Sequence, residues 1–440
     1  MANPIPLDVY VNETHVGVLS EDRDGLFVFT YLPGIAADQL VSLTMPVRAE
    51  SYKWGRGGLH PYFCMNLPEG SKKDLVRQQL GSTAQLTDIG LLALTGQRTI
   101  GRVRCVPQGQ PPTFADDNLQ VATLLASPDA RELLLRHLED GVTEGVSGVM
   151  PKLLREDKTT TATQEYIVKT GRTDLPGLSI NEYLCLLAAH RAGLDVPEAR
   201  LSEDGSVLAV RRFDRPKSGV ILGVEDFCSL EGNDPAAKYD GSLESLAKRL
   251  RDYVPPKLFL DSATRLFKLL LINYAIHNAD AHLKNFALTY TSLDDVALAP
   301  VYDILTVSAY PKFADDIPGL TLEGKKVWGC GKALHKFAAQ RLQLPSGTRA
   351  EALDRVTAAL KATFADIHTY AEKYPYFRET AKNMLDQWEL GISGILPTAT
   401  ARLPQPGEVR ESFGLSGQSS ARRPVNAYVN PDGGFSHKAR

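Results

Sequence analysis

Near the start of the chain, apolar residues alternate with other residue types over positions 5–11, and β-prone stretches follow at 15–19 and 26–31. Since successive side chains of a strand point to opposite faces, this alternation predicts a small antiparallel sheet. Between residues 66 and 94 the apolar spacing becomes helical. We therefore expect an amino-terminal βα subdomain that ends near Val106.

The segment 107–112 is predicted to be a linker, because its prolines and glycine oppose both helix and strand. Beyond a helix around 129–138, residues 141–215 have the pattern of strands, a glycine-rich turn and a helix. That helix is expected to open with a capping box from Ser179 to Glu182.

From about Leu243 onward the pattern is mainly helical, with an apolar run up to Ile276 and one apolar helical face over 356–367. Large apolar residues become sparse beyond Pro397, where Gly, Ser, Pro and Arg accumulate. A segment of this composition cannot bury enough apolar surface to order itself, so 398–440 is expected to be a disordered tail.

Composition and charge narrow the class of protein. The chain has 440 residues, 43% apolar and 23% charged, which suits a globular protein of roughly two to three domains. Its 49 Lys and Arg against 52 Asp and Glu leave a formal net charge of -3, which provides no global attraction for nucleic acid. Five scattered cysteines without a CxxC pair favour neither disulfides nor a thiolate zinc site. Without a recognisable leader or a long apolar stretch, we expect no membrane contact and a cytoplasmic location.

The densest polar cluster, His-Asn-Ala-Asp-Ala-His-Leu-Lys-Asn at 277–285, directly follows the most apolar predicted helix. Phosphoryl transfer needs a carboxylate to receive the hydroxyl proton and an amide oxygen to bind Mg²⁺, and Asp280 and Asn285 supply both. Lys284 would then neutralise the transferred group. The alternative is that residues 277–285 have no catalytic role and only form the end of a helix with solvated polar side chains.

A third interpretation of the same cluster is a hydrolase metal site, because the side chains of His277, Asp280 and His282 suit Zn²⁺ or Mn²⁺. Downstream, Asp303 is an isolated carboxylate in the apolar segment 299–304 and needs a partner. In the kinase interpretation that partner is Mg²⁺; otherwise Asp303 caps a turn or pairs with an arginine.

Upstream, the glycines and Lys152 of segment 141–152 would let N–H groups and a cation approach phosphate oxygens, although a plain turn is the more frequent explanation. Lys169 closes an apolar β run, a position from which kinases bind nucleotide phosphates, and Glu182 is its candidate partner. An edge-strand lysine that guards against aggregation is the alternative. Phe213 follows another strand, from which it would contact an adenine ring; a surface strand end with mixed charges is the alternative.

Five short motifs then occur in order: Asn181-Glu182, Arg212-Phe213-Asp214-Arg215, Glu225-Asp226-Phe227-Cys228, Asp280-Ala281-His282-Leu283-Lys284-Asn285 and Tyr302-Asp303-Ile304. With these motifs the chain resembles the HipA family of serine/threonine kinases, the toxins of bacterial type II toxin–antitoxin modules. The resemblance implies an α+β, bilobal protein-kinase-like (HipA-like) fold, with a mixed β amino-terminal half, an extra subdomain and an all-helical carboxy-terminal lobe.

The expected domains are an amino-terminal subdomain at 1–106, a kinase N-lobe-like region with the phosphate loop at 107–225, a helical lobe at 226–397 and the tail at 398–440. By motif position, the resemblance implies that Asp280, with Lys284, is catalytic and that Asn285 and Asp303 bind Mg²⁺. The implied ATP contacts are Gly148, Lys152, Lys169, Phe213 and His282.

One departure from the family concerns the phosphate loop, which typically has the pattern S-x-S/A-G-x-Q-x-K. In the family, autophosphorylation of the first serine ejects this loop and inactivates the kinase. That serine is Gly145 here, and the glutamine is Met150, so Ser147 is the remaining candidate for autophosphorylation. The catalytic and metal-binding positions are intact, which favours an active kinase.

The resemblance implies an ATP- and Mg²⁺-dependent serine/threonine kinase that phosphorylates an aminoacyl-tRNA synthetase, the glutamyl type being the best guess. Such phosphorylation halts translation and arrests growth. The implied partner is a small helix-turn-helix antitoxin (HipB-like), through which the toxin reaches operator DNA. The alternative is a catalytically weak HipA-like protein that acts mainly as antitoxin partner and transcriptional co-repressor.

Overall fold

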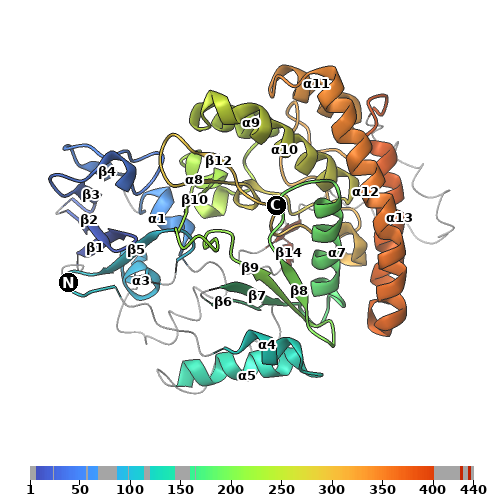
Figure 1. Cartoon of the computed structure of the whole chain (residues 1–440), viewed down its shortest axis with the longest axis horizontal. Coiled ribbons are helices and arrows are strands. Elements are labelled where there is room, and N and C mark those ends of the chain that lie inside the picture. The colour runs from blue at the N-terminus through green and yellow to red at the C-terminus, as the bar shows by residue number, and fades with distance from the viewer. Residues whose placement is uncertain are drawn as a thin grey trace.

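The computed structural model describes residues 6–22, 24–55, 58–67, 87–97, 99–112, 119–143, 159–163, 165–400, 427–429 and 435–437. Within these ranges the strands form antiparallel sheets, and the longest helices lie on the side of the molecule opposite the amino-terminal sheet (Figure 1).

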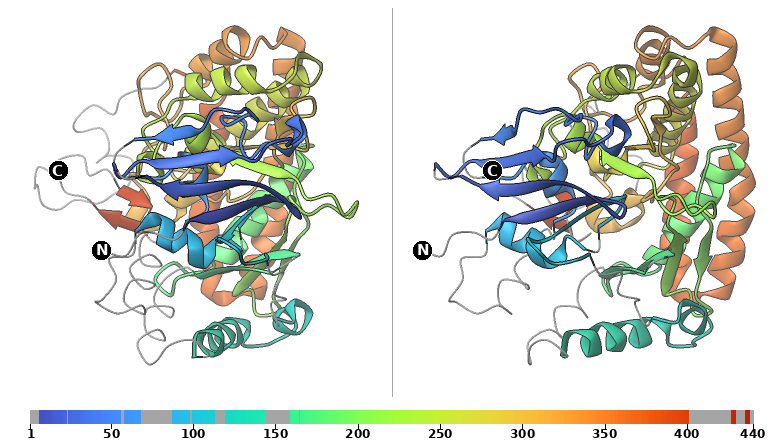
Figure 2. Two further views of the ribbon diagram at one scale, coloured as in Figure 1. Left: turned by 90° about the vertical axis from the view of Figure 1, so that its left-hand side faces the viewer. Right: turned by 60° about the vertical axis from the view of Figure 1, so that its left-hand side comes forward.

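The amino-terminal sheet has the strand order β4-β3-β2-β1-β5 and is turned toward the viewer in Figure 2. Its strands are β1 (Leu7–Val11), β2 (Thr14–Glu21), β3 (Phe27–Tyr31), β4 (Tyr52–Trp54) and β5 (Val103–Pro107). Leu7, Val9 and Val11 are completely buried, which confirms the predicted alternation. Helices α1 (Pro61–Met65) and α3 (Asp88–Thr95) add Phe63 and Leu91 to the same core.

The second sheet has the order β6-β7-β9-β8. Its strands are β6 (Thr159–Ala162), β7 (Tyr166–Thr170), β8 (Ala199–Leu201) and β9 (Val207–Arg211). Helices α4 (Val121–Leu125) and α5 (Ala130–Thr143) cover one face, with Leu134 packed in the cluster that contains Val168 (Figure 1). Since neighbouring strand residues point to opposite faces, Lys169 faces the other side, where α7 (Leu178–Arg191) lies.

The predicted capping box at the start of α7 is wrong. The helix is preceded by Gly177, whose φ of 71° lies in the left-handed region that glycine adopts without strain, and no side chain caps it. The Ser179 hydroxyl donates to the carbonyl oxygen of Ser206 instead, at 2.9 Å. Glu182 is directed to Lys169, so both residues of the expected box serve tertiary contacts.

A third sheet, β10-β11-β12, consists of β10 (Gly223–Asp226), β11 (Ala287–Tyr290) and β12 (Ala297–Leu298). The expectation of an all-helical carboxy-terminal lobe is therefore wrong in one respect. The chain that leaves the loop 277–285 extends and pairs Ala287 with Asp226, which satisfies its backbone groups without a helix. This pairing fixes the loop beside the end of β10.

The remaining helices form the carboxy-terminal lobe. They are α8 (Phe227–Leu230), α9 (Leu243–Tyr253), α10 (Pro256–Ala275), α11 (Gly331–Gln340), α12 (Ser346–Lys373) and α13 (Arg378–Gly394). Val356, Leu360 and Ile367 of α12 are fully buried, as the helical face predicted. No helix in the described ranges combines the length and the apolar character that crossing a membrane requires.

Short 3-10 helices and two further strands complete the description. They are η1 (Ala37–Gln39), η2 (Pro235–Ala237), η3 (Leu283–Asn285), η4 (Val307–Ala309), η5 (Pro311–Phe313), η6 (Pro375–Phe377), β13 (Ala427–Val429) and β14 (Phe435–His437). Strands β13 and β14 pair with each other. The expectation of a disordered tail otherwise concerns residues outside those described.

Candidate functional site

The loop after α10 is shaped by its own amide side chains. His277 has a φ of 50°, which turns the chain out of the helical direction. The Asn278 amide nitrogen donates to the Asn273 amide oxygen at 2.8 Å, and the Asn278 amide oxygen accepts the backbone N–H of Asp280 at 3.2 Å. The buried end of α10 thereby fixes the backbone that carries Asp280.

Asp280 is 7% exposed and lies next to two aromatic groups. The Tyr239 hydroxyl donates to Asp280 Oδ1 at 2.5 Å, and His282 Nε2 lies 3.7 Å from the same oxygen. Burial, with the nearby charge of Lys238, lowers the pKa of His282 well below its usual value, so the imidazole is neutral. Asp280 is thus an oriented carboxylate beside neutral rings.

Lys169 joins the second sheet to the loop region. Its Nζ lies 2.6 Å from Glu182 Oε1 on α7 and 2.7 Å from Asp303 Oδ1. Burial alone would lower the pKa of Lys169, but the charges of Asp303 and Glu182 outweigh burial and raise it above its usual value. The lysine is therefore a permanent cation between two carboxylates that lie far apart in sequence.

Asn285 and Asp303, the two expected Mg²⁺ ligands, are in contact. The Asn285 amide nitrogen donates to Asp303 Oδ2 at 3.1 Å, and Asp303 has a φ of 54°. A carboxylate and an amide are oxygen donors that suit Mg²⁺. The Asn285 oxygen faces the backbone N–H of His282 at 3.2 Å, so Mg²⁺ coordination by Asn285 requires its amide to turn over.

Lys284 and Phe213 contact the surroundings of this cluster. Lys284 Nζ donates to the carbonyl oxygen of Met65 at 3.5 Å, and the Lys284 carbonyl accepts the Tyr302 hydroxyl at 2.8 Å. The Phe213 ring lies 5.6 Å from the Tyr302 ring, next to Asp303 in sequence. Lys284 therefore points toward α1, and Phe213 lies at the edge of the loop region.

Three expected ATP-loop residues, Ser147, Gly148 and Lys152, lie outside the described residues. Their expected roles stay predictions.

His277 does not take part in the cluster. Its Nδ1 is hydrogen-bonded to Gln387 Oε1 at 2.5 Å, and its ring stacks on Trp328 at 4.6 Å. In the described part of the chain, no three His, Cys, Asp or Glu side chains converge as a metal site. The hydrolase interpretation with His277, Asp280 and His282 as joint ligands is therefore wrong in its geometry.

Comparison with known families decides the relationship. Residues 145–364 match the model described as the HipA-like C-terminal domain, and residues 7–106 match the HipA N-terminal domain. The chain belongs to the HipA family.

Curated relatives are 25–29% identical to this chain. "Putative kinase Y4mE" of Sinorhizobium fredii is 29% identical over 337 residues, which cover 69% of this chain and 78% of the relative. "Putative kinase Y4dM" of the same organism is 25% identical over 425 residues, which cover 86% of this chain and 98% of the relative.

Among solved structures, a chain from the complex of Shewanella oneidensis MR-1 HipA, HipB and operator DNA superposes with a TM-score of 0.63. The two chains are 18% identical, and the match covers 88% of this chain and 99% of that one. This likeness confirms the expected α+β, HipA-like fold.

The HipA N-terminal domain contacts the third sheet through Glu225, near the end of β10. Glu225 is completely buried and accepts the Ser42 hydroxyl at 2.8 Å and the Leu43 backbone N–H at 2.9 Å. It also accepts the Ser229 hydroxyl at 3.2 Å. Burial raises the pKa of Glu225 to about 7, although these hydrogen bonds oppose the shift.

The Arg212-Phe213-Asp214-Arg215 motif has a structural role at the same junction. Arg212 and Asp214 form a buried ion pair with a closest distance of 2.6 Å. Asp214 also accepts the backbone N–H of Gly101 at 2.9 Å, and Arg212 donates to the carbonyl oxygen of Thr99. The motif therefore attaches the HipA N-terminal domain to the second sheet.

Sequence reasoning missed Tyr239 and Asp316, both near Asp280. Tyr239 occurs in an ordinary Lys-Tyr-Asp-Gly stretch that carries no signal of its own. The pKa of Asp316 is raised to about 7, by burial first and then by the charges of Asp315 and Asp280. The doublet of carboxylates at 315–316 was visible in the sequence, but nothing local relates it to residue 280.

Proposed function

We propose that this HipA-family chain is a serine/threonine protein kinase that uses ATP and Mg²⁺. The observation that carries the proposal is Lys169, which lies between Glu182 and Asp303, with Asn285 bound to Asp303 on the loop that presents Asp280. Kinases use a strand lysine paired with a helix glutamate, a metal-binding aspartate and a loop aspartate in this way.

In this proposal, Asp280 orients the substrate hydroxyl and accepts its proton during transfer. The Tyr239 hydroxyl positions the Asp280 carboxylate, and the loop amides keep its backbone in place. Lys169 binds phosphate oxygens, and Phe213 and His282 lie at the nucleotide. Asn285 and Asp303 would bind Mg²⁺, which supplies charge neutralisation for the phosphates when it is present.

We further propose that the kinase acts in the cytoplasm as the toxin of a toxin–antitoxin module. The relatives named as kinases and the fold shared with a HipA that forms a complex with HipB and operator DNA support this role. The proposed partner is a helix-turn-helix antitoxin, with operator DNA reached through it. The proposed substrate is an aminoacyl-tRNA synthetase, glutamyl type first, and Ser147 is the proposed autophosphorylation site.

The decisive experiment incubates the purified full chain with Mg²⁺ and labelled ATP, alone and with a panel of aminoacyl-tRNA synthetases. Intact mass and phosphopeptide mapping of 141–152 accompany the assay. We expect phosphate on a synthetase or on Ser147 with wild type and none with Asp280→Asn. The control Asp354→Asn, an exposed acid on α12, should behave as wild type.

A folded wild-type protein that modifies neither itself nor any synthetase would refute the kinase proposal. If Asp280→Asn retained both growth arrest and operator repression, the co-repressor alternative would replace it.

A further inference from the structure

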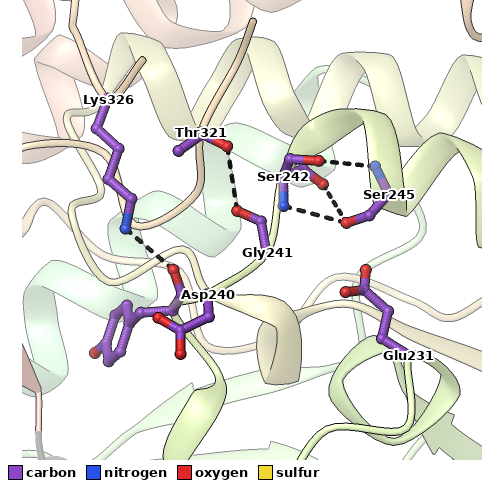
Figure 3. Close-up of a pocket in the computed structure, with 8 residues that line it drawn as sticks. Glu231, Asp240, Gly241, Ser242, Ser245, Thr321 and Lys326 are labelled. Atoms are coloured by element: carbon purple, nitrogen blue, oxygen red, sulfur yellow. Dashed lines mark hydrogen bonds between the residues drawn. The ribbon is translucent and has the colours of Figure 1, made fainter. Parts of the chain in front are cut away.

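A cavity of about 370 Å³ opens beside the catalytic loop (Figure 3). Glu231 lines one side, Lys326 lies across from it, and the segment 240–242 passes between them, followed by Ser245 in the first turn of α9. We call this cavity the Asp240 pocket after the exposed carboxylate at its edge.

The segment that lines the Asp240 pocket also packs against the catalytic loop. Tyr239 lines the pocket and donates its hydroxyl to Asp280. The carbonyl oxygen of the preceding residue, Lys238, accepts the backbone N–H of Leu283 at 3.0 Å. A Cβ atom at Gly241 would come within 2.5 Å of the Leu283 side chain, so the two segments are in direct contact. A peptide whose hydroxyl reaches Asp280 therefore passes close to this pocket.

The polar groups of the pocket differ in their availability. Ser242 and Ser245 use their hydroxyls in the capping box of α9, which the dashed lines of Figure 3 mark. Glu231 Oε1 is buried and has no hydrogen-bond partner within the described residues. Burial raises the pKa of Glu231, although the Ser245 hydroxyl and the charge of Arg249 oppose the shift. The carboxylates of Glu231 and Asp240 have no ion-pair partner within 4.0 Å in the described part of the chain.

The cations around the pocket make their short contacts with other groups, although the charge of Arg249 also acts on Glu231. Lys326 donates to the carbonyl oxygens of Tyr239 at 3.1 Å and Gly319 at 2.7 Å. Burial lowers the pKa of Lys326, which weakens it as a counter-ion, although Asp240 opposes the shift. Arg249, on α9, pairs with Asp252 at 3.1 Å.

A second acidic segment acts on Asp280 as well. Asp315 and Asp316 follow η5, and the charge of Asp280 contributes to the raised pKa of Asp316. Because its pKa is raised to about 7, Asp316 carries only part of a negative charge near neutral pH. The carboxylates near Asp280 nevertheless favour a cationic substrate segment.

We propose that the Asp240 pocket is a substrate subsite that receives an arginine or lysine side chain close to the phosphorylated serine or threonine. This inference rests on the proposed kinase function. The two carboxylates of the pocket, Glu231 and Asp240, determine its preference for a basic side chain. The pocket thus defines the substrate class as hydroxyl-bearing protein segments with a nearby basic residue.

The test uses nine-residue alanine peptides with a central serine and one arginine placed at each other position in turn, beside matched glutamine peptides. Fluorescence anisotropy measures their binding to the full chain with Mg²⁺ and a non-hydrolysable ATP analogue. At one spacing we expect arginine to bind about five- to tenfold more tightly than glutamine at low salt, and less so at high salt. The variant Asp240→Asn/Glu231→Gln should reduce the preference to below about twofold, and Asp354→Asn should preserve it.

Equal binding of arginine and glutamine peptides at every spacing, or an unchanged preference in the double variant, overturns the inference. A parallel assay of phosphate transfer from ATP separates this failure from that of the kinase proposal. If the arginine preference depends on Glu231 and Asp240 but no phosphate is transferred to peptide or protein, the subsite stands and the kinase function fails. If phosphate is transferred but arginine and glutamine peptides bind equally, the kinase function stands and the subsite fails.

Discussion

Two carboxylates of the candidate site are stabilised in different ways. Asp303 lies 2.7 Å from the ammonium group of Lys169, which also pairs with Glu182. Asp280 accepts a hydrogen bond from the neutral phenol of Tyr239. A nearby cation favours the charged form of a carboxylate much more than a neutral donor does. The difference suits Asp303 to binding a metal cation and Asp280 to accepting a proton.

A third carboxylate, that of Glu225, lies where the HipA N-terminal domain contacts β10. Glu225 is buried more deeply than either residue, and the partners of its carboxylate are two hydroxyls and one backbone N–H. Because these donors are neutral, burial dominates and raises its pKa to about 7. The comparison teaches that the nature of the donor, as well as the depth of burial, decides the charge of each carboxylate.

The largest effect is expected for Asp280→Asn. Removal of the proton acceptor should lower phosphate transfer at least about 10³-fold. ATP affinity should stay within about threefold, because the substitution does not touch the Lys169 cluster. Single-turnover transfer and nucleotide titration measure the two quantities, with Asp354→Asn as the matched control. A variant that retained a tenth of the activity would show that Asp280 is not the base.

Lys169→Met tests the ion-paired side. The side chains of Glu182 and Asp303 are 3% and 29% exposed, so loss of the lysine leaves one buried and one half-buried carboxylate without their cation. We expect the free energy of unfolding to fall by about 3 kcal/mol, together with loss of ATP binding.

The matched control for this substitution is Lys336→Met, which breaks the exposed pair with Glu323. Its effect should be below about 1 kcal/mol, since water screens exposed pairs. Urea unfolding followed by tryptophan fluorescence compares the two variants. Equal losses of unfolding free energy in the two variants would mean that burial does not strengthen the ion pairs of Lys169.

Glu225→Gln tests the third carboxylate through pH. The folded pKa is about 7 and the usual value is 4.5, so between these values the folded state binds more protons than the unfolded state. The unfolding free energy of wild type should therefore fall as pH rises through this window, by about 3 kcal/mol from Glu225. The variant should have a flatter profile.

Asp316 has a shift of the same sign, so the informative quantity is the difference between the wild-type and Glu225→Gln profiles measured by urea unfolding at pH 4.5 to 8. Parallel profiles would contradict the raised pKa of Glu225.

The smallest effect is expected for Tyr239→Phe, which removes one hydrogen bond to Asp280 and keeps the ring. Loss of a hydrogen bond to a charged group should cost about 1.5 kcal/mol, or roughly a tenfold decrease in kcat. KM for ATP should be unchanged, because Lys169 and Asp303 are not affected. Steady-state kinetics separate the two parameters. An altered KM for ATP with normal kcat would place Tyr239 at the nucleotide.

Much of the candidate site was predictable, because its signals are short. Asp280 and Asn285 lie five positions apart on one loop, and Asp303 follows in a short apolar segment. The pairing of Lys169 with Glu182 was also expected and is found at 2.6 Å. Tyr239 was not predictable, since no local pattern relates it to a carboxylate 41 positions away.

The sequence by itself determined the first three strands of the first sheet, the apolar faces of the helices and the motifs that mark the HipA family, because each of these depends on residues close together in the chain. Only the tertiary structure decided that Lys169 reaches Asp303 over 134 positions and that Ser42 reaches Glu225 over 183. It also used the Ser179 hydroxyl for the carbonyl oxygen of Ser206 instead of the expected cap. Such contacts arise where sheets and helices pack, and the free energy of a buried charge depends on the partners that packing brings to it.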